Sequence, residues 1–364
     1  MKIAVYAIAL NEASFVARFC QSAADADYII IADTGSDDAT VEIAREHGAS
    51  VYPISIAPWR FDKARDAALA LVPADADICI ALDIDEIMMS GWREEIERVW
   101  TPDTTCLRYL YDWGHNKLFY ANKIHQRRGY YWRHPCHEYP YPELRTTQVM
   151  AETSMLLIKH LPDPQKSRKQ YLGLLELSVR EDPSCPRNAF YYARELTYYA
   201  RWQDAVGALT TYLQNPEAAW NLERCYAMRL LGTSHAKLGN DTLARQWFQR
   251  AVSEAPGTRE PWLELAMHAY GVKDWLTCYY AAKSGLAIKQ KSFTYIDDPR
   301  SWGPTLSDLG GLAAYKLGMH AQAVELGQAA IEFAPDDQRL QMNLAYYTQA
   351  LLDDKNIMKS EQVN

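Results

Sequence analysis

The sequence predicts two domains of different fold class: an α/β N-terminal domain built on a parallel sheet, and an all-α C-terminal domain of helical repeats. Over about the first hundred residues, short strands that are apolar at every position alternate with helical segments. Beyond residue 166 the pattern becomes helical and repeats itself. The length of 364 residues leaves room for two or three domains with sizeable cores.

Four strands support the α/β prediction, and they are expected at residues 2–10, 28–32, 50–54 and 78–82. Helices are expected between them at residues 40–47 and 60–71, and Asn11 is placed to cap a helix after the first strand. Strands that are apolar throughout are typical of a parallel sheet covered by helices on both faces.

Polar side chains follow the first, second and fourth strands, at Asn11-Glu12, at Asp33 and at Asp83-Ile84-Asp85-Glu86. In open α/β sheets ligands bind beyond the carboxyl ends of the strands, so these residues are expected to converge on one site. The two aspartates of the D-x-D offer hard oxygen ligands suited to Mg²⁺ or Mn²⁺.

The C-terminal repeat is carried by small residues at fixed spacing. Gly232, Ala244, Phe248, Ala251 and Pro256 recur, with the same intervals, as Gly311, Ala323, Gly327, Ala330 and Pro335. Small residues let paired helices approach closely, and proline ends the second helix of each pair. The pattern resembles the tetratricopeptide repeat, interrupted at residues 289–304, and a plain helical bundle is the alternative.

The amino-acid composition limits the classes of protein to which this chain can belong. Apolar residues make up 48% and charged residues 23%, as in ordinary globular proteins. The net charge of −8 is a weak argument against a general nucleic-acid coat protein. No stretch approaches the ~20 apolar residues of a membrane span, and the N-terminus lacks the features of a secretory signal. Seven scattered cysteines without a C-x-x-C favour reduced thiols and a cytoplasmic location over a zinc site.

The order of the N-terminal motifs resembles family 2 glycosyltransferases of the GT-A (Rossmann-like) fold. An apolar strand leads to Asn11-Glu12, a second strand leads to the turn Asp33-Thr34-Gly35-Ser36-Asp37-Asp38-Ala39-Thr40, and Asp83-x-Asp85 follows a later strand. The resemblance covers roughly residues 1–170. We therefore expect a GT-A domain at 1–165, a tetratricopeptide-like domain at 166–355 and a tail at 356–364.

The resemblance implies a nucleotide-sugar donor site, with UDP as the family-level expectation. The residues it places against the donor are Leu10, Asn11, Glu12, Asp33, Arg65 and Asp83, with Lys166 and Arg168 able to clamp the diphosphate from the domain junction. Asp85 is expected to ligate the metal and to be essential for catalysis, Asp83 to face the metal or the ribose, and His160 to complete the coordination of Mn²⁺ or Mg²⁺. A divalent cation would neutralise the leaving nucleoside diphosphate.

His137-Glu138 resembles the family's His-Glu pair after the metal motif, and an inverting transfer needs a carboxylate to take the acceptor proton. Glu138 is therefore the expected base, and Glu86 is the alternative. Residues 113–136 contain five Lys and Arg side chains among aromatic ones and no acid. This stretch and the histidine that follows it predict a stacking surface for the acceptor, at Trp113, Arg127, Arg128, Trp132 and His137.

The sequence thus predicts an enzyme, a metal-dependent and inverting glycosyltransferase that acts on a hydroxyl of a macromolecular acceptor. The acceptor classes left open are a protein or peptide, a glycan, and a hydroxymethylated base in phage-type DNA. A non-catalytic tetratricopeptide-like scaffold with a degenerate transferase domain is the alternative from another class of function.

Overall fold

The structure is a computed structural model that describes residues 1–163 and 168–363. The chain divides into two compact units, Met1–Pro183 with Phe293–Tyr295, and Ser184–Ser292 with Ile296–Asn364. The domain boundary expected between residues 165 and 166 lies outside the described residues. The two units are described separately below.

The first unit begins with the parallel strands that the sequence predicts. Strands β1 (Ile3–Ala9), β2 (Tyr28–Asp33), β3 (Ser50–Pro53) and β4 (Ile78–Ala81) lie in the order β3-β2-β1-β4, and all three neighbouring pairs are parallel. Between them lie the helices α1 (Val16–Ser22), α2 (Thr40–Glu46) and α3 (Phe61–Leu71). The α/β fold class is confirmed. Asn11 caps no helix, because α1 starts only at Val16.

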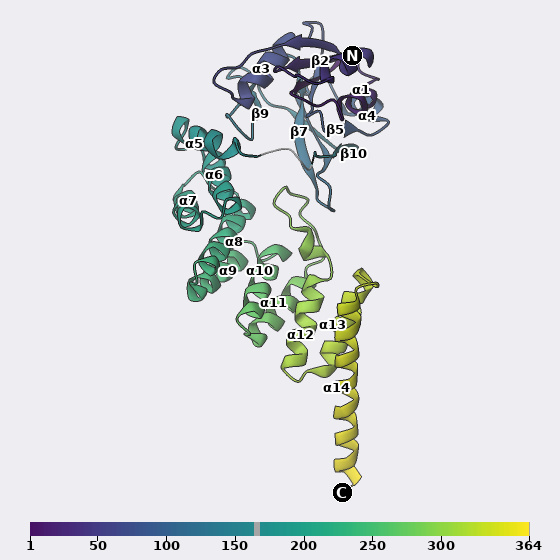
Figure 1. Ribbon diagram of the computed structural model, residues 1–364, viewed down its shortest axis with the longest axis vertical. Coiled ribbons are helices and arrows are strands. Elements are labelled where there is room, and N and C mark those ends of the chain that lie inside the picture. The colour runs from purple at the N-terminus through teal and green to yellow at the C-terminus, as the bar shows by residue number, and fades with distance from the viewer. Residues whose placement is uncertain (164–167, 364) are drawn as a thin grey trace. The chain divides into compact units, whose positions relative to one another are not determined.

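Both faces of this sheet are covered, as full burial of the strands requires. On one face Val5 and Ile80 belong to a core with Phe19 of α1 and with α4 (Trp92–Val99). On the other face Tyr6 belongs to a core with Ala68 and Leu69 of α3. Figure 1 shows these helices around the sheet.

The sheet is mixed rather than wholly parallel. Four further strands extend it beyond β4 in the order β7-β6-β10-β5, namely β5 (Glu86–Met88), β6 (Cys106–Asp112), β7 (Leu118–Gln126) and β10 (Met150–His160). Strand β7 is antiparallel to both β4 and β6, while β10 is parallel to β6 and antiparallel to β5. A separate antiparallel ribbon is formed by β8 (Tyr130–Arg133) and β9 (Tyr139–Pro142). Helix α5 (Tyr171–Glu181) completes this unit.

The second unit consists of the helix pairs that the repeat predicts, and its all-α fold class is confirmed. The pairs are α6 (Pro186–Tyr198) with α7 (Trp202–Gln214), α8 (Asn221–Lys237) with α9 (Asp241–Glu254), α10 (Arg259–Gly271) with α11 (Trp275–Ala287), and α12 (Thr305–Lys316) with α13 (His320–Phe333). The expected interruption lies between α11 and α12 and contains the short 3₁₀ helix η1 (Pro299–Trp302). Helix α14 (Gln338–Val363) runs through most of the residues assigned to the tail.

Gly232 shows why the repeat needs small residues. A β-carbon at this position would lie 2.6 Å from the Phe248 ring, so α8 and α9 contact each other at a distance that only glycine permits. Phe248 itself is buried in the core between the helix pairs.

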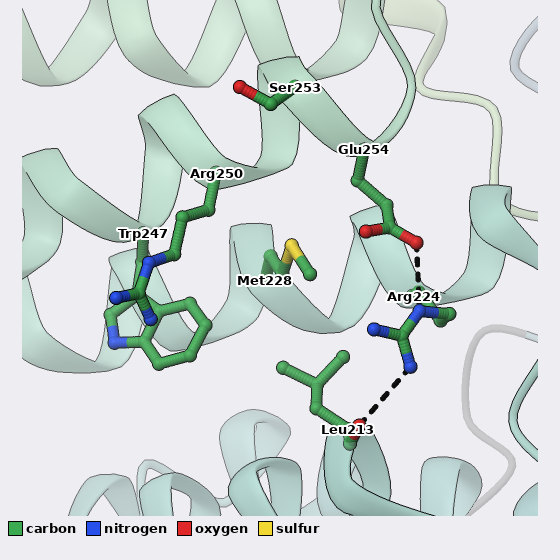
Figure 2. A pocket seen from close by; sticks show the side chains of 7 residues that line it. All are labelled: Leu213, Arg224, Met228, Trp247, Arg250, Ser253 and Glu254. Atoms are coloured by element: carbon green, nitrogen blue, oxygen red, sulfur yellow. Dashed lines mark hydrogen bonds and ion pairs between the residues drawn. The ribbon is translucent and has the colours of Figure 1, made fainter. Parts of the chain in front are cut away.

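A cavity of about 380 Å³ opens between α7, α8 and α9 (Figure 2). Arg224 at its wall donates to Glu254 at 2.8 Å and to the carbonyl oxygen of Leu213 at 3.2 Å. Trp247 and Arg250 form another part of the wall, with the guanidinium 4.5 Å from the ring centroid. The positive charge of Arg224 is therefore paired with the carboxylate of Glu254.

None of the helices in the described part of the chain is both long enough and apolar enough to cross a membrane. All seven cysteines are among the described residues and are free thiols, as the sequence predicts.

Substituting Gly232 by alanine should destabilise the helical unit by about 1–3 kcal/mol, because the added methyl group meets a buried aromatic ring that has little room to move. The matched control is Gly207→Ala in α7, where a β-carbon meets nothing within 4 Å. That variant should gain about 0.5–1 kcal/mol from helix propensity. Calorimetric unfolding of the full chain measures both, and equal Tm values for G232A and the wild type would contradict the packing argument.

Candidate active site

The parallel strands bring the predicted site residues to one edge of the sheet. Ala9 at the end of β1 pairs with Asp33 at the end of β2, and Tyr6 of β1 pairs with Ala81 at the end of β4. The segments that begin at Leu10, Asp33 and Leu82 therefore leave neighbouring strands in the same direction. The convergence predicted from the sequence is confirmed at the level of the backbone.

The first two of these segments are bound to each other by hydrogen bonds. Asn11, in a left-handed backbone conformation with φ of 56°, accepts a hydrogen bond from the Asp37 amide at 2.9 Å. The Asp33 carboxylate accepts hydrogen bonds from the Gly35 amide at 3.1 Å and from the Ser36 hydroxyl at 2.6 Å. These bonds fix the turn that follows β2 beside the end of β1.

Leu10 and Glu12, the two neighbours of Asn11 in the chain, differ in their exposure to solvent. Leu10 is exposed, whereas Glu12 is buried and its amide donates to the Thr40 hydroxyl at 2.7 Å. Leu10, Asn11, Glu12 and Asp33 thus form one continuous wall at the end of β1 and β2. Their contacts with a donor stay a prediction.

Arg65 of α3 joins two of the predicted site residues. Its side chain is 2% exposed, forms an ion pair with Asp83 and donates from Nε to Glu138 Oε1 at 3.1 Å. It also donates to the carbonyl oxygen of Leu82 at 3.0 Å. Burial opposes the Arg65 charge, but Asp83 and Glu138 outweigh it and raise the pKa of the guanidinium.

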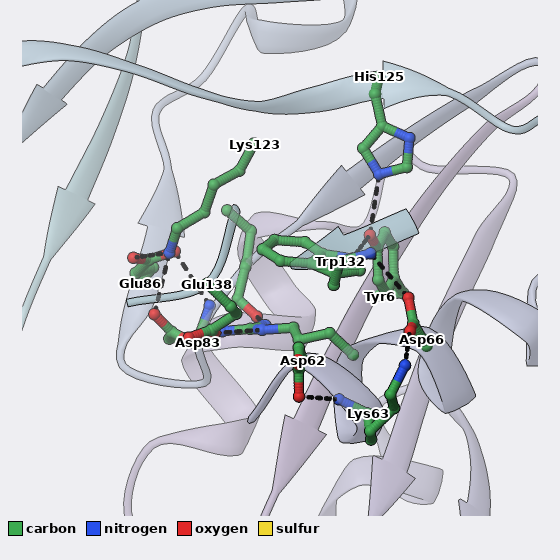
Figure 3. Close-up of polar contacts among 12 residues, drawn as sticks. Tyr6, Asp62, Lys63, Asp66, Asp83, Glu86, Lys123, His125, Trp132 and Glu138 are labelled. Carbon is green, nitrogen blue, oxygen red and sulfur yellow. Dashed lines mark hydrogen bonds and ion pairs between the residues drawn. The ribbon is translucent and has the colours of Figure 1, made fainter. Parts of the chain in front are cut away.

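Lys123 of β7 binds the same aspartate from the other side (Figure 3). Its ammonium group lies 3.0 Å from both Asp83 Oδ2 and Glu86 Oε1. Burial favours the neutral form of Asp83, but Arg65 and Lys123 prevail and hold its pKa well below the usual range. Asp83 is therefore an ionised carboxylate held between two cations.

Glu86 is bound too tightly to exchange a proton freely with a substrate. It is fully buried, accepts from the Tyr111 hydroxyl at 2.5 Å and from the Asp83 amide at 3.0 Å, and pairs with Lys123. Glu138 keeps a side chain that is 12% exposed, and burial raises its pKa above the usual range although Arg65 lies beside it. Of the two carboxylates, Glu138 is the more accessible.

Lys123 and Tyr111 are site residues that the sequence did not single out. A lysine in a basic stretch indicates a solvated face, and only the tertiary pairing of β7 with β4 (Ile80 opposite Ile124) brings Lys123 to Asp83. Tyr111 reaches Glu86 because β6 and β5 flank β10.

Asp85 and His160, both predicted as metal ligands, lie beside each other. His160 Nε2 lies 3.4 Å from Asp85 Oδ2, and the Leu161 amide donates to the Asp85 carbonyl at 2.7 Å, so β10 brings the histidine to the D-x-D segment. The Trp113 ring packs on His160 with centroids 4.3 Å apart. His160 Nδ1 is buried without a hydrogen bond, so one ring nitrogen is turned to Asp85 and the other to the interior.

Asp83, the third predicted metal ligand, does not join this pair, since Arg65 and Lys123 occupy its carboxylate. Within residues 1–163 and 168–363, no three His, Cys, Asp or Glu side chains gather around one point as metal ligands. The donor atoms that could hold a divalent cation here are a carboxylate oxygen of Asp85 and Nε2 of His160.

The residues predicted to bind the acceptor separate into two groups. Trp113 and Arg128 are exposed, and His137 is half-buried with its ring 6.0 Å from that of Tyr171. Arg127 instead binds the carbonyl oxygen of Val72 at 2.9 Å, which makes it a structural contact. Trp132 is also a correction, because its ring is 1% exposed and belongs to the core.

Lys166 and Arg168 are the two residues at the domain junction that were predicted to clamp the diphosphate. Lys166 lies outside the described residues. Arg168 is described, and its guanidinium lies 4.6 Å from the centroid of the Tyr171 ring.

A buried chain of hydrogen bonds holds Trp132 under the site (Figure 3). The Trp132 indole donates to the Tyr6 hydroxyl at 2.8 Å, and that hydroxyl lies 2.9 Å from His125 Nε2. His125 Nδ1 lies 2.8 Å from the Gln126 carbonyl oxygen, to which it must donate, so Nε2 accepts the Tyr6 proton. Burial lowers the pKa of His125 to about 4, and the ring is neutral at pH 7.

Comparison with known proteins agrees with this geometry. In open α/β sheets ligands bind beyond the carboxyl ends of the strands, which is where the ionisable groups of this domain gather. Residues 5–156 match the family described as Glycosyl transferase family 2. The similarity to family 2 glycosyltransferases that the sequence motifs indicate is therefore shown for residues 5–156.

Three solved structures show the range of similarity found. The APC/C hetero-tetramer Cut9–Hcn1 matches with 19% identity and a TM-score of 0.38, covering 51% of this chain and 33% of that chain. A TPR protein of Thermus thermophilus matches with 17% identity and a TM-score of 0.33, covering 50% and 90%. The C-terminal part of a TPR repeat-containing protein from Cytophaga hutchinsonii matches with 17% identity and a TM-score of 0.41, covering 51% and 67%.

Replacing Arg65 by methionine should destabilise the first unit by about 3–5 kcal/mol, because Arg65 is buried and its loss leaves the largely buried Glu138 and the partly exposed Asp83 without their shared partner. The matched control is Arg98→Met, which removes an ion pair to Glu95 from an arginine that is 64% exposed and should cost less than about 1 kcal/mol. Chemical denaturation measures both losses. Equal losses of stability in the two variants would contradict this prediction, because they would show that burial of Arg65 adds nothing to the cost of removing its charge.

Lowering the pH should weaken the fold through His125. The histidine pKa rises from about 4 in the folded chain to the ordinary 6.5 on unfolding, so between these values the unfolded chain binds a proton that the folded chain does not. The contribution is complete above pH 6.5 and falls by up to about 3 kcal/mol as the pH approaches 4. His125→Gln should be less stable at neutral pH but lose less stability over this interval. Parallel pH profiles of the two proteins would contradict the assignment.

Proposed function

We propose that this protein is a metal-dependent, inverting glycosyltransferase that moves a sugar from a nucleoside diphosphate donor, with UDP the first to test, to a hydroxyl of a macromolecular acceptor. The observation that supports this proposal most is that two groups of polar side chains lie at the same edge of the sheet. One is the Asp85–His160 pair, and the other is the group Arg65, Asp83, Lys123 and Glu138. All of these residues except His160 lie within residues 5–156, the part of the chain that matches Glycosyl transferase family 2.

Asp85 and His160 are the residues that would hold the cation. Their oxygen and nitrogen donors suit Mn²⁺ better than Mg²⁺, which prefers oxygen ligands throughout. A bound divalent cation supplies charge neutralisation for the diphosphate leaving group. Asp83, ionised between Arg65 and Lys123, is suited to accept hydrogen bonds from the ribose hydroxyls of the donor.

Glu138 is the proposed base. The acceptor hydroxyl attacks the anomeric carbon, the bond from that carbon to the diphosphate oxygen breaks, and the hydroxyl proton passes to a carboxylate oxygen of Glu138. A carboxylate whose pKa is raised by burial accepts a proton more readily at neutral pH. Arg65 orients Glu138 by its hydrogen bond and keeps it close to Asp83. Glu86 supports the site by binding Lys123.

A panel of nucleotide sugars with Mn²⁺ tests the proposal, with nucleoside diphosphate release as the measurement. Asp85→Asn and His160→Ala should each lower release by at least about 10-fold and weaken Mn²⁺ binding in electron paramagnetic resonance titrations. The matched control is His320→Ala, which removes the histidine of another Asp–His pair, to Asp354 in the helical unit, and should change neither.

Undiminished release from D85N would contradict the metal assignment. Release from no donor, together with no binding of Mn²⁺ or nucleotide, would contradict the transferase proposal and favour the scaffold alternative. Peptide, glycan and hydroxymethylated DNA acceptors, added in turn, separate the acceptor classes by which of them stimulates release.

A further inference from the structure

Helix α5 is fixed by ion pairs to the two elements that meet at the proposed base. Glu181, the last residue of α5, lies 2.6 Å from Arg60, which directly precedes α3. Asp182, the next residue, lies 2.7 Å from Arg133 at the end of β8. The loop from β8 to β9 begins after Arg133 and ends with Glu138, so α5 is anchored where this loop starts.

The other end of α5 reaches the same loop through Tyr171, its first residue. The Tyr171 ring meets two rings edge to face, with centroids 6.0 Å from that of Phe61 in α3 and 6.0 Å from that of His137 in the loop. The Phe61 amide in turn donates to the Pro135 carbonyl oxygen at 3.0 Å. Tyr171 is therefore packed against both α3 and the residue that directly precedes Glu138.

The charged groups of the site act on the phenol of Tyr171. Burial and the neighbouring Cys136 are the first causes that raise the pKa of Tyr171 to about 12. Asp83 and Glu138 raise this pKa further, whereas the Arg168 guanidinium opposes them. Because such effects weaken with distance, the phenol lies near both carboxylates. At neutral pH it keeps its proton and is a hydrogen-bond donor.

The Tyr171 hydroxyl has this proton to offer to a ligand. Within residues 1–163 and 168–363 it forms no hydrogen bond, and the side chain is half-buried. The hydroxyls of Tyr6 and Tyr111, which are buried in the same unit, are bound by Trp132 and Glu86 instead. A phenol that the protein leaves without a partner, beside two carboxylates of the site, can donate to a substrate oxygen.

The place of the phenol indicates which part of the substrate it meets. Asp83 is proposed to bind the ribose of the donor, and Glu138 is proposed to take the proton of the acceptor hydroxyl. The transferred sugar lies between these two points, because its anomeric carbon is linked to the diphosphate and is attacked by that hydroxyl. A donor group near both carboxylates therefore borders the space that the sugar must occupy.

We propose that Tyr171 is a further donor-binding residue, and that its hydroxyl donates a hydrogen bond to an oxygen of the transferred sugar. This inference rests on the proposed function, since it concerns the donor of the same site. The diphosphate and the acceptor are the other groups that the hydroxyl could meet, and the test separates them.

Tyr171→Phe removes the hydroxyl alone, because it keeps the ring that packs against Phe61 and His137. In the full chain with Mn²⁺ and the donor that the panel identifies, this variant should raise the KM for the nucleotide sugar by about 3- to 10-fold. The Kd of the matching nucleoside diphosphate, which lacks the sugar, should stay at the wild-type value in calorimetric titrations. The KM for the acceptor that stimulates release should also stay unchanged.

The matched control is Tyr120→Phe. Tyr120 of β7 is also half-buried, and the Arg108 guanidinium lies 4.7 Å from its ring centroid, as Arg168 lies 4.6 Å from that of Tyr171. The control should change none of the three constants.

An unchanged KM for the nucleotide sugar in Y171F would overturn the inference. Equal weakening of the nucleotide sugar and the nucleoside diphosphate would also overturn it, since the hydroxyl would then bind the diphosphate. A rise confined to the acceptor KM would do the same, and in all three cases the transferase proposal stands. Release from no donor by the wild type would instead contradict the proposed function.

Discussion

The site depends on one buried guanidinium. Arg65 leaves α3, passes under the sheet edge and holds Asp83, Glu138 and the Leu82 carbonyl together. Two segments that are far apart in the sequence, residues 82–83 and Glu138, are thereby fixed to one side chain. A buried cation of this kind is stable only while its acidic partners are in place, so the geometry of the donor end and of the proposed base are set by the same contact.

A second cation completes this arrangement from the opposite side. Lys123 comes from β7, a strand that runs antiparallel to β4, whereas Arg65 comes from a helix that packs on the parallel half of the sheet. Asp83 therefore joins the two halves of the mixed sheet electrostatically. The acid is held in its ionised form by both halves, and neither half alone provides the site.

The sequence was sufficient for the parallel half of the fold and for most acidic site residues, because strands such as β1 and β4 are apolar throughout and the acids follow them directly. It was insufficient for β5 to β10, which mix apolar, polar and aromatic residues and in which β10 pairs with β5 and β6, and β7 with β4, although these strands are not consecutive. Trp132 and Lys123 show the reason: within one basic, aromatic stretch, strand register alone decides that Trp132 is buried and that Lys123 reaches Asp83.

The two faces of the β8–β9 ribbon are subject to different constraints. The inner face is held to β1 through Trp132 and Tyr6, so a change there disturbs the packing of the central sheet. The outer face contributes little to that packing. A substitution of Tyr131, which is 38% exposed, should therefore disturb the fold less than one of Trp132, which is 1% exposed. One face of the ribbon can therefore vary in sequence while the other keeps its contact with the central sheet.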